Sequence, residues 1–383
     1  MPDLLPTGAL LCWTRNQSAE GKHPMRSRHS VVGRGGLAAA LMVGALAGAH
    51  ALRRAGQWAL HANRPDEYRD ENFALFDSDT VSTVRTADGV RLAVRTHGHE
   101  DAAATVVFVH GFCNTMESFH FQRRDLPQRW GPDVRLVFFD QRGHGRSGTP
   151  PKGSCTVGRL GRDLGTVIEK VAPTGPVVLV GHSLGGMTVL AAASRFPELF
   201  ATRISAVALI STTAAEVTSM GVTQLLRNPA VDGFRLLAHL APALVQAGRT
   251  TARHVITPLL HVTSFHGPVS PALSRFTTRM IDRTPIDTIV QFLDSLRVHD
   301  ESAALPALAT TPVLVLGGSN DLVIPFGHSR LLAEALPVSE LVRVRDAAHM
   351  PHLQHPDQVN DALDGLLVRA GIFDEDMRLR LGG

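Results

Sequence analysis

The chain has 383 residues, of which 44% are hydrophobic and 19% are charged, a balance that excludes a disordered or fibrous protein. Residues 1–70 contain nine Lys and Arg against five Asp and Glu, which leaves 29 against 30 for the rest of the chain. The basic charge therefore belongs to the N-terminal arm, and the remainder shows no nucleic-acid footprint. Three cysteines are too few for a disulfide framework or a metal cluster, and we expect neither a metal nor a cofactor.

Residues 1–70 form a leader in this interpretation. An uncharged, Ala-rich run at 35–52 follows several arginines and ends in Ala-His-Ala, with Arg53 and Arg54 directly after it. A basic stretch, an apolar stretch and a small-residue site describe a secretory signal, and the same run is marginal in length for a membrane anchor. We therefore expect an exported or membrane-associated protein. A cytoplasmic leader is the alternative, and Met25 is a second candidate start.

From residue 80 onward, short apolar runs alternate with stretches of helical pattern. Two strands at 81–85 and 90–96 flank Asp88 and Gly89, which predict a two-residue hairpin turn. The later runs are at 105–109, 134–139, 177–180, 204–210, 312–316 and 341–344. Runs that are apolar on both faces are typical of parallel strands covered by helices on each side. The sequence thus predicts an α/β fold with a doubly wound, mostly parallel sheet.

The strand rhythm stops between residues 214 and 303. This stretch is rich in leucine and punctuated by prolines, and it has no clear strand. Its helical pattern predicts a cap inserted into the sheet domain. The expected organisation is a first part of the core at 80–213, the helical cap at 214–303 and a second part of the core at 304–372.

The apolar run at 177–180 leads directly into Gly-His-Ser-Leu-Gly-Gly at 181–186, which a helix-forming stretch at 187–195 follows. A strand that passes through Gly-x-Ser-x-Gly into a helix is a nucleophile elbow. The turn is sharp because it must lift the hydroxyl of Ser183 above the sheet. Gly181 and Gly185 would suit it because a Cβ atom at either position would collide as strand and helix crowd together.

Three further motifs follow predicted strands in a consistent order. They are His-Gly-Phe at 110–112, Asp-Gln-Arg-Gly-His-Gly-Arg-Ser-Gly at 140–148, and the late pair Gly-Gly-Ser-Asn-Asp at 317–321 and Asp-Ala-Ala-His at 346–349. Together with the elbow, this succession resembles the α/β-hydrolase superfamily, in its branch of esterases and lipases with a helical cap. The resemblance covers roughly residues 80–372.

The resemblance implies a serine hydrolase with the catalytic residues Ser183, Asp321 and His349, in the chain order that the superfamily uses. Ser183 would be the nucleophile, His349 its base, and Asp321 the acid that orients the imidazole. The backbone amides of Leu184 and Phe112 would form the oxyanion hole.

Other polar residues compete for these roles. His352 and His355 share the loop of His349, whereas His182 points away from the neighbouring serine because successive side chains diverge at the turn. Asp140, Arg142 and His144 fit a structural turn in which side chains tie loops together by hydrogen bonds. We interpret Cys113 as a buried bystander thiol.

The expected reaction is cleavage of a carboxylic ester of a lipophilic small molecule through an acyl-enzyme. The apolar cap favours a lipophilic group in the substrate. Haloperoxidase-like activity, C–C bond hydrolysis and acyl transfer remain open, as does a ligand-binding protein with little turnover. Epoxide hydrolases and haloalkane dehalogenases resemble this fold but carry aspartate at the elbow, so Ser183 argues against both.

Overall fold

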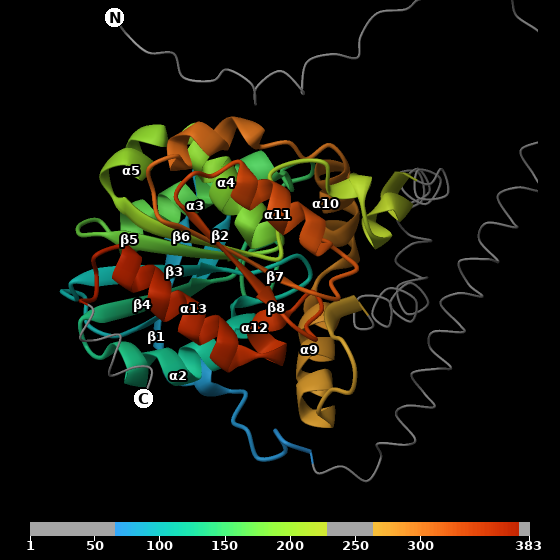
Figure 1. Ribbon diagram of the computed structural model, residues 1–383, viewed down its shortest axis with the longest axis horizontal. Coiled ribbons are helices and arrows are strands. Elements are labelled where there is room, and N and C mark those ends of the chain that lie inside the picture. The colour runs from blue at the N-terminus through green and yellow to red at the C-terminus, as the bar shows by residue number, and fades with distance from the viewer. Residues whose placement is uncertain (1–65, 228–262, 375–383) are drawn as a thin grey trace, which may run out of the picture. The chain divides into compact units, whose positions relative to one another are not determined.

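The computed structural model describes residues 66–227 and 263–374. In this part of the chain, eight strands form a single sheet with the order β1-β2-β4-β3-β5-β6-β7-β8. Helices cover both faces of the sheet (Figure 1). The strands from β4 through β3 to β8 pair in parallel, and β1 and β2 add an antiparallel hairpin at one edge. The prediction of a doubly wound, mostly parallel sheet is confirmed.

The strands are β1 (Thr80–Arg85), β2 (Arg91–His97), β3 (Ala104–Val109), β4 (Val134–Phe139), β5 (Val177–His182), β6 (Ile204–Ile210), β7 (Val313–Gly318) and β8 (Ser339–Val344). The α-helices are α2 (His120–Trp130), α3 (Val157–Val171), α4 (Leu184–Arg195), α5 (Pro197–Thr202), α9 (Pro271–Arg283), α10 (Ile286–Arg297), α11 (Phe326–Glu334), α12 (Pro351–Gln354) and α13 (Pro356–Arg369). Short 3-10 helices are η1 (Leu75–Ser78), η2 (Met116–Phe119), η3 (Val217–Ser219), η4 (Val222–Arg227) and η5 (Ser302–Leu308).

The sequence predicts a two-residue turn between β1 and β2, and this prediction is wrong. The backbone N–H of Thr86 donates to the carbonyl of Val90, so three residues form the loop between them. Gly89, the last of the three, has a φ of 86°. A three-residue hairpin loop places its final residue in the left-handed region, which glycine adopts without strain.

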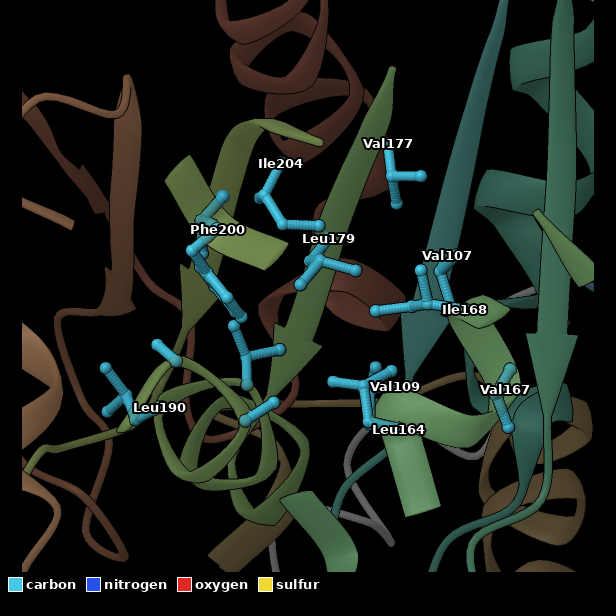
Figure 2. Packing of buried hydrophobic residues seen from close by; sticks show 14 of the residues in the cluster. Val107, Val109, Leu164, Val167, Ile168, Val177, Leu179, Leu190, Phe200 and Ile204 are labelled. Atoms are coloured by element: carbon cyan, nitrogen blue, oxygen red, sulfur yellow. The ribbon is translucent and has the colours of Figure 1, made fainter. Parts of the chain in front are cut away.

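Alternate residues of the central strands pack into two cores, one on each face of the sheet. Val107 and Val109 face α3, α4 and α5, where Leu164 and Phe200 join one apolar cluster (Figure 2). Val106 and its neighbours on the other face pack against α2 and α13. Both faces are buried because a parallel sheet is covered by helices on each side, which explains why the strands appear in the sequence as uninterrupted apolar runs.

A long segment joins β6 to β7 and coincides with the stretch expected to form a cap. Its described part contains η3, η4, α9 and α10. A single antiparallel bridge links Ala215, near the start of the segment, to Asp300, near its end. Residues 228–262, which carry much of the leucine-rich pattern, lie outside the described residues. The cap as a unit therefore stays a prediction.

The leader at 1–70 falls almost entirely outside the described residues, and so does the candidate signal or anchor at 35–52. Among the helices that the structure does describe, none combines the length and the apolar character needed to cross a bilayer.

Candidate active site

Ser183 is the single residue between β5 and α4. Its φ of 52° and ψ of −117° depart from both strand and helix geometry, and its backbone N–H donates to the carbonyl of Ile210 at 2.9 Å. A Cβ atom on Gly185 would overlap the carbonyl oxygen of Val109, and one on Gly181 would lie 2.7 Å from the carbonyl oxygen of Gly185. Strand and helix therefore cross too closely for side chains at these two positions, as the sequence motif predicts. The tight crossing holds Ser183 in a strained conformation above the end of the sheet.

The structure brings Ser183, His349 and Asp321 into one chain of hydrogen bonds. Nε2 of His349 lies 2.9 Å from Oγ of Ser183, and Nδ1 of His349 lies 2.8 Å from Oδ2 of Asp321. Because an ionised carboxylate can only accept, the ring hydrogen sits on Nδ1 and leaves Nε2 free to accept the serine proton. All three residues are at least nine-tenths buried. This is the arrangement required to activate a serine hydroxyl.

Asp321 and His349 come from loops at the carboxyl ends of β7 and β8, two strands that pair in parallel. The second carboxylate oxygen of Asp321, Oδ1, accepts backbone N–H bonds from Val323 at 2.8 Å and Ile324 at 2.9 Å. These bonds fix the plane of the carboxylate and aim Oδ2 at the imidazole. The loop thus fixes the acid independently of the base.

Leu184 and Phe112, the two residues expected to form the oxyanion hole, follow the neighbouring strands β5 and β3. Leu184 is the first residue of α4, so its backbone N–H has no partner within the helix and lies next to Ser183. Phe112 follows β3, and the next two amides of that loop are already engaged: Cys113 donates to Nε2 of His144, and Asn114 to the carbonyl of Gly111. The amide of Phe112 has no such partner among the described residues.

The polar cluster after β4 holds loops in place, as the sequence suggested. Asp140 accepts backbone N–H bonds from Met116 at 2.8 Å and Arg146 at 2.7 Å. The fully buried guanidinium of Arg142 pairs with Asp163 at 2.6 Å. Together with the bond from Cys113 to His144, these contacts confirm a structural role for the turn.

The competing histidines and the cysteine do not reach Oγ of Ser183 through any hydrogen bond in the described structure. His352 is fully buried, and burial, together with the nearby His349, lowers its pKa to about 3. The ring of His355 instead donates to the backbone carbonyl of Asp346. Burial raises the pKa of the Cys113 thiol far above its usual value, so Cys113 is an unreactive, buried thiol.

Two residues that the sequence did not assign to the site hold the His349 loop. Nε2 of His182 lies 2.8 Å from the backbone carbonyl oxygen of His349. The amide of Gln354 accepts from the backbone of His266 and Ala348 at 3.1 Å each, and donates to the carbonyls of His266 and Asp346. His182 stands within the elbow motif, which is a usable signal, whereas nothing in the sequence marks Gln354.

No group of three His, Cys, Asp or Glu side chains within 66–227 and 263–374 is arranged to hold a metal ion. The chemistry that the described residues offer is proton transfer between a serine hydroxyl and an imidazole.

Comparison with known proteins agrees with this architecture. The model of the alpha/beta hydrolase fold family matches residues 104–356. A monoacylglycerol lipase from Mycolicibacterium smegmatis is 26% identical over 264 residues, which are 67% of this chain and 85% of the lipase.

Two solved structures share the fold at lower identity. An esterase from Thermogutta terrifontis has a TM-score of 0.59 and 23% identity, over 76% of this chain and 99% of the esterase. A bromoperoxidase from Bacillus anthracis has a TM-score of 0.60 and 19% identity, over 75% of this chain and 99% of the bromoperoxidase. The family match extends from β3 to the start of α13 and includes the elbow and both late loops, so the chain belongs to the alpha/beta hydrolase fold family.

Proposed function

We propose that the protein is a serine hydrolase that cleaves a carboxylic ester of a lipophilic small molecule through an acyl-enzyme intermediate. The observation that carries this proposal is the hydrogen-bond chain from Ser183 through His349 to Asp321. A serine hydroxyl is a weak nucleophile at neutral pH, and an oriented imidazole in contact with it supplies the base that it needs.

In the first half of the reaction, Nε2 of His349 takes the proton of Ser183 as Oγ attacks the carbonyl carbon of the ester. Asp321 stabilises the imidazolium through the Nδ1–H bond and keeps the ring in its orientation. The imidazolium then gives its proton to the leaving alkoxide as the ester C–O bond breaks. A water molecule, deprotonated in turn by His349, attacks the acyl-serine; as the C–Oγ bond breaks, the imidazolium returns the proton to Oγ of Ser183 and the acid is released.

The negative charge that develops on the carbonyl oxygen needs donors that are already in place. We assign this role to the amides of Leu184, at the start of α4, and of Phe112, in the loop after β3. An amide in such a position lowers the barrier by about 3–4 kcal/mol in comparable hydrolases.

The lipophilic character of the substrate is inferred from the side chains around these two residues. Leu184 packs in a buried apolar cluster with Val217 of η3, Ile324 and Phe292 of α10, and Phe112 packs against the same cluster. The rings of Phe112 and Phe292 have centroids 6.0 Å apart. Apolar side chains from the β6–β7 segment thus pack against the candidate oxyanion residues, and an apolar environment beside the reacting carbonyl favours an acyl chain or another apolar group. The lipase relative, which acts on monoacylglycerol by its name, supports the same substrate class.

The test is covalent labelling of the full-length protein by a fluorophosphonate probe, with the adduct mapped by mass spectrometry, alongside hydrolysis of p-nitrophenyl esters of increasing chain length. We expect an adduct on Ser183 that Ser183→Ala abolishes, together with ester turnover. An adduct without turnover of any ester would instead favour acyl transfer or ligand binding. Folded protein that takes no label at Ser183 would overturn the proposal.

A further inference from the structure

His182 is the last residue of β5 and directly precedes Ser183. Its side chain is fully buried, and its Nε2 lies 2.8 Å from the backbone carbonyl oxygen of His349. A carbonyl oxygen only accepts, so the ring carries its hydrogen on Nε2 and donates it. One side chain therefore joins the strand that carries Ser183 to the loop that carries His349, although 167 residues separate the two bonded residues.

The same ring also packs against the loop that carries Phe112. A Cβ atom added to Gly111 would lie 2.7 Å from Nδ1 of His182, which shows how closely the ring approaches that backbone. Nδ1 itself has no hydrogen-bond partner among the described residues. The His182 ring thus contacts the base loop through a hydrogen bond and the loop of Phe112 through packing.

The surroundings of His182 keep its ring neutral. Its ring centroid lies 4.3 Å from that of His352 and 5.0 Å from that of His349, and His110 is a further electrostatic neighbour. Burial, reinforced by these imidazoles, holds the pKa of His182 well below its usual value. A neutral ring donates its hydrogen bond without placing a positive charge beside the base.

We propose that His182 is a positioning residue for the hydrolysis proposed above, and that its hydrogen bond to the His349 carbonyl sets the distance between the imidazole of His349 and Oγ of Ser183. The inference rests on the proposed function because it assigns His182 a role through His349. A base displaced by about 1 Å loses roughly 10²-fold in rate, so a single bond of this kind matters to turnover.

Three substitutions separate the hydrogen bond from simple filling of space. His182→Leu keeps much of the volume and removes the donor. His182→Gln restores an amide N–H near the position of Nε2, whereas the shorter His182→Asn does not reach it. We expect kcat for a p-nitrophenyl ester to fall about 10²-fold in His182→Leu with KM little changed, and to recover at least partly in His182→Gln but not in His182→Asn.

His120 provides a matched control. It is also fully buried, bonds once through Nε2, to Glu71 at 2.8 Å, and has no partner for Nδ1 among the described residues. His120→Leu should lower the free energy of unfolding and leave kcat within about twofold of the wild type. The NMR signal of the proton between His349 and Asp321 should change in His182→Leu and stay unchanged in His120→Leu.

Two results would overturn the positioning role. One is a folded His182→Leu protein that keeps the wild-type kcat and the wild-type rate of fluorophosphonate labelling at Ser183. The other is equal loss of kcat in His182→Leu and His120→Leu, which would trace the effect to general destabilisation. If the His182→Leu variant does not fold, equal kcat values for His182→Gln and His182→Asn would overturn the positioning role of His182. A wild-type protein without labelling or turnover would contradict the proposed function itself, which keeps the two failures distinct.

Discussion

Nε2 of His349 lies 2.9 Å from Oγ of Ser183, although 166 residues separate the two in the chain. The β6–β7 segment and both strands that follow it lie between them in sequence. The contact forms because parallel strands end at the same edge of the sheet, so the loops after β5, β7 and β8 meet there.

Removing the imidazole from this contact should abolish hydrolysis. We expect His349→Ala to lower kcat by about 10⁴-fold or more, because Ser183 then has no base. His355→Ala is the control, since His355 stands six residues later and bonds to a backbone carbonyl instead of the serine. Steady-state kinetics on a p-nitrophenyl ester measures both. Comparable losses in the two variants would remove His349 from its proposed role.

The elbow should not tolerate a methyl group on its second glycine. A Cβ atom at Gly185 would overlap the carbonyl oxygen of Val109, so Gly185→Ala must push α4 away from β3. We expect loss of activity and a lower melting temperature. Gly365→Ala in α13 is the matched substitution, because nothing lies within 4 Å of its added Cβ atom. Alanine there should stabilise the helix by about 0.5–1 kcal/mol in thermal unfolding. Wild-type activity and stability in Gly185→Ala would contradict the close crossing of strand and helix.

Arg142 should be important for stability. Its buried guanidinium pairs with Asp163 at 2.6 Å and with Asp88 at 2.9 Å. Arg142→Leu would leave the carboxylate of Asp163 buried without its partner, which costs about 3–5 kcal/mol of unfolding free energy. Lys170→Ala, which breaks the exposed pair with Glu169, should cost about 0–1 kcal/mol. Urea unfolding followed by circular dichroism compares the two, and a loss below about 1 kcal/mol for Arg142→Leu would disagree with the structure.

The buried histidines should make the fold sensitive to acid. Burial lowers the pKa of His110 to about 3 and that of His144 to about 4, and burial with the nearby His349 lowers that of His352 to about 3. An unfolded histidine titrates near 6.5, so between pH 6.5 and these values the unfolded chain binds more protons. The contribution of these histidines to the free energy of unfolding is therefore fully present above about pH 6.5. Between that pH and the folded pKa, each histidine lowers the free energy of unfolding by about 1.4 kcal/mol per pH unit as the pH decreases.

Urea unfolding at a series of pH values measures this slope. Replacing one of these groups, in His352→Leu, should reduce the slope between pH 6 and pH 4 by about 1.4 kcal/mol per unit. A variant with the wild-type slope would show that His352 takes up its proton equally well in the folded state.

Much of the core could be predicted because its strands are buried on both faces. Runs such as the one that became β5 are apolar throughout, a pattern typical of a parallel strand covered on both faces. The candidate site residues could be proposed because they stand directly after such runs. The hairpin turn was harder to predict: Asp88 and Gly89 suit either of two loop lengths, and the pairing of Thr86 with Val90 decided between them.

The remaining contacts depend on residues far apart in the chain. His182 was correctly expected to turn away from Ser183, but its carbonyl partner at His349 follows from the placement of β5 relative to β8 and not from any local pattern. The four side-chain hydrogen bonds of Gln354 depend in the same way on His266, which lies 88 positions earlier in the chain. Local periodicity cannot specify such pairs, because they form only when the sheet order is established.

The order in which the strands are made has a consequence for biosynthesis. Ser183 and the helix behind it are translated long before Asp321 and His349, whose loops follow the last two strands of the sheet. A nascent chain that ends before β8 carries Ser183 but lacks the imidazole of His349. The hydroxyl therefore remains without its base until β8 has been added beside β7, because the loop that carries His349 follows β8.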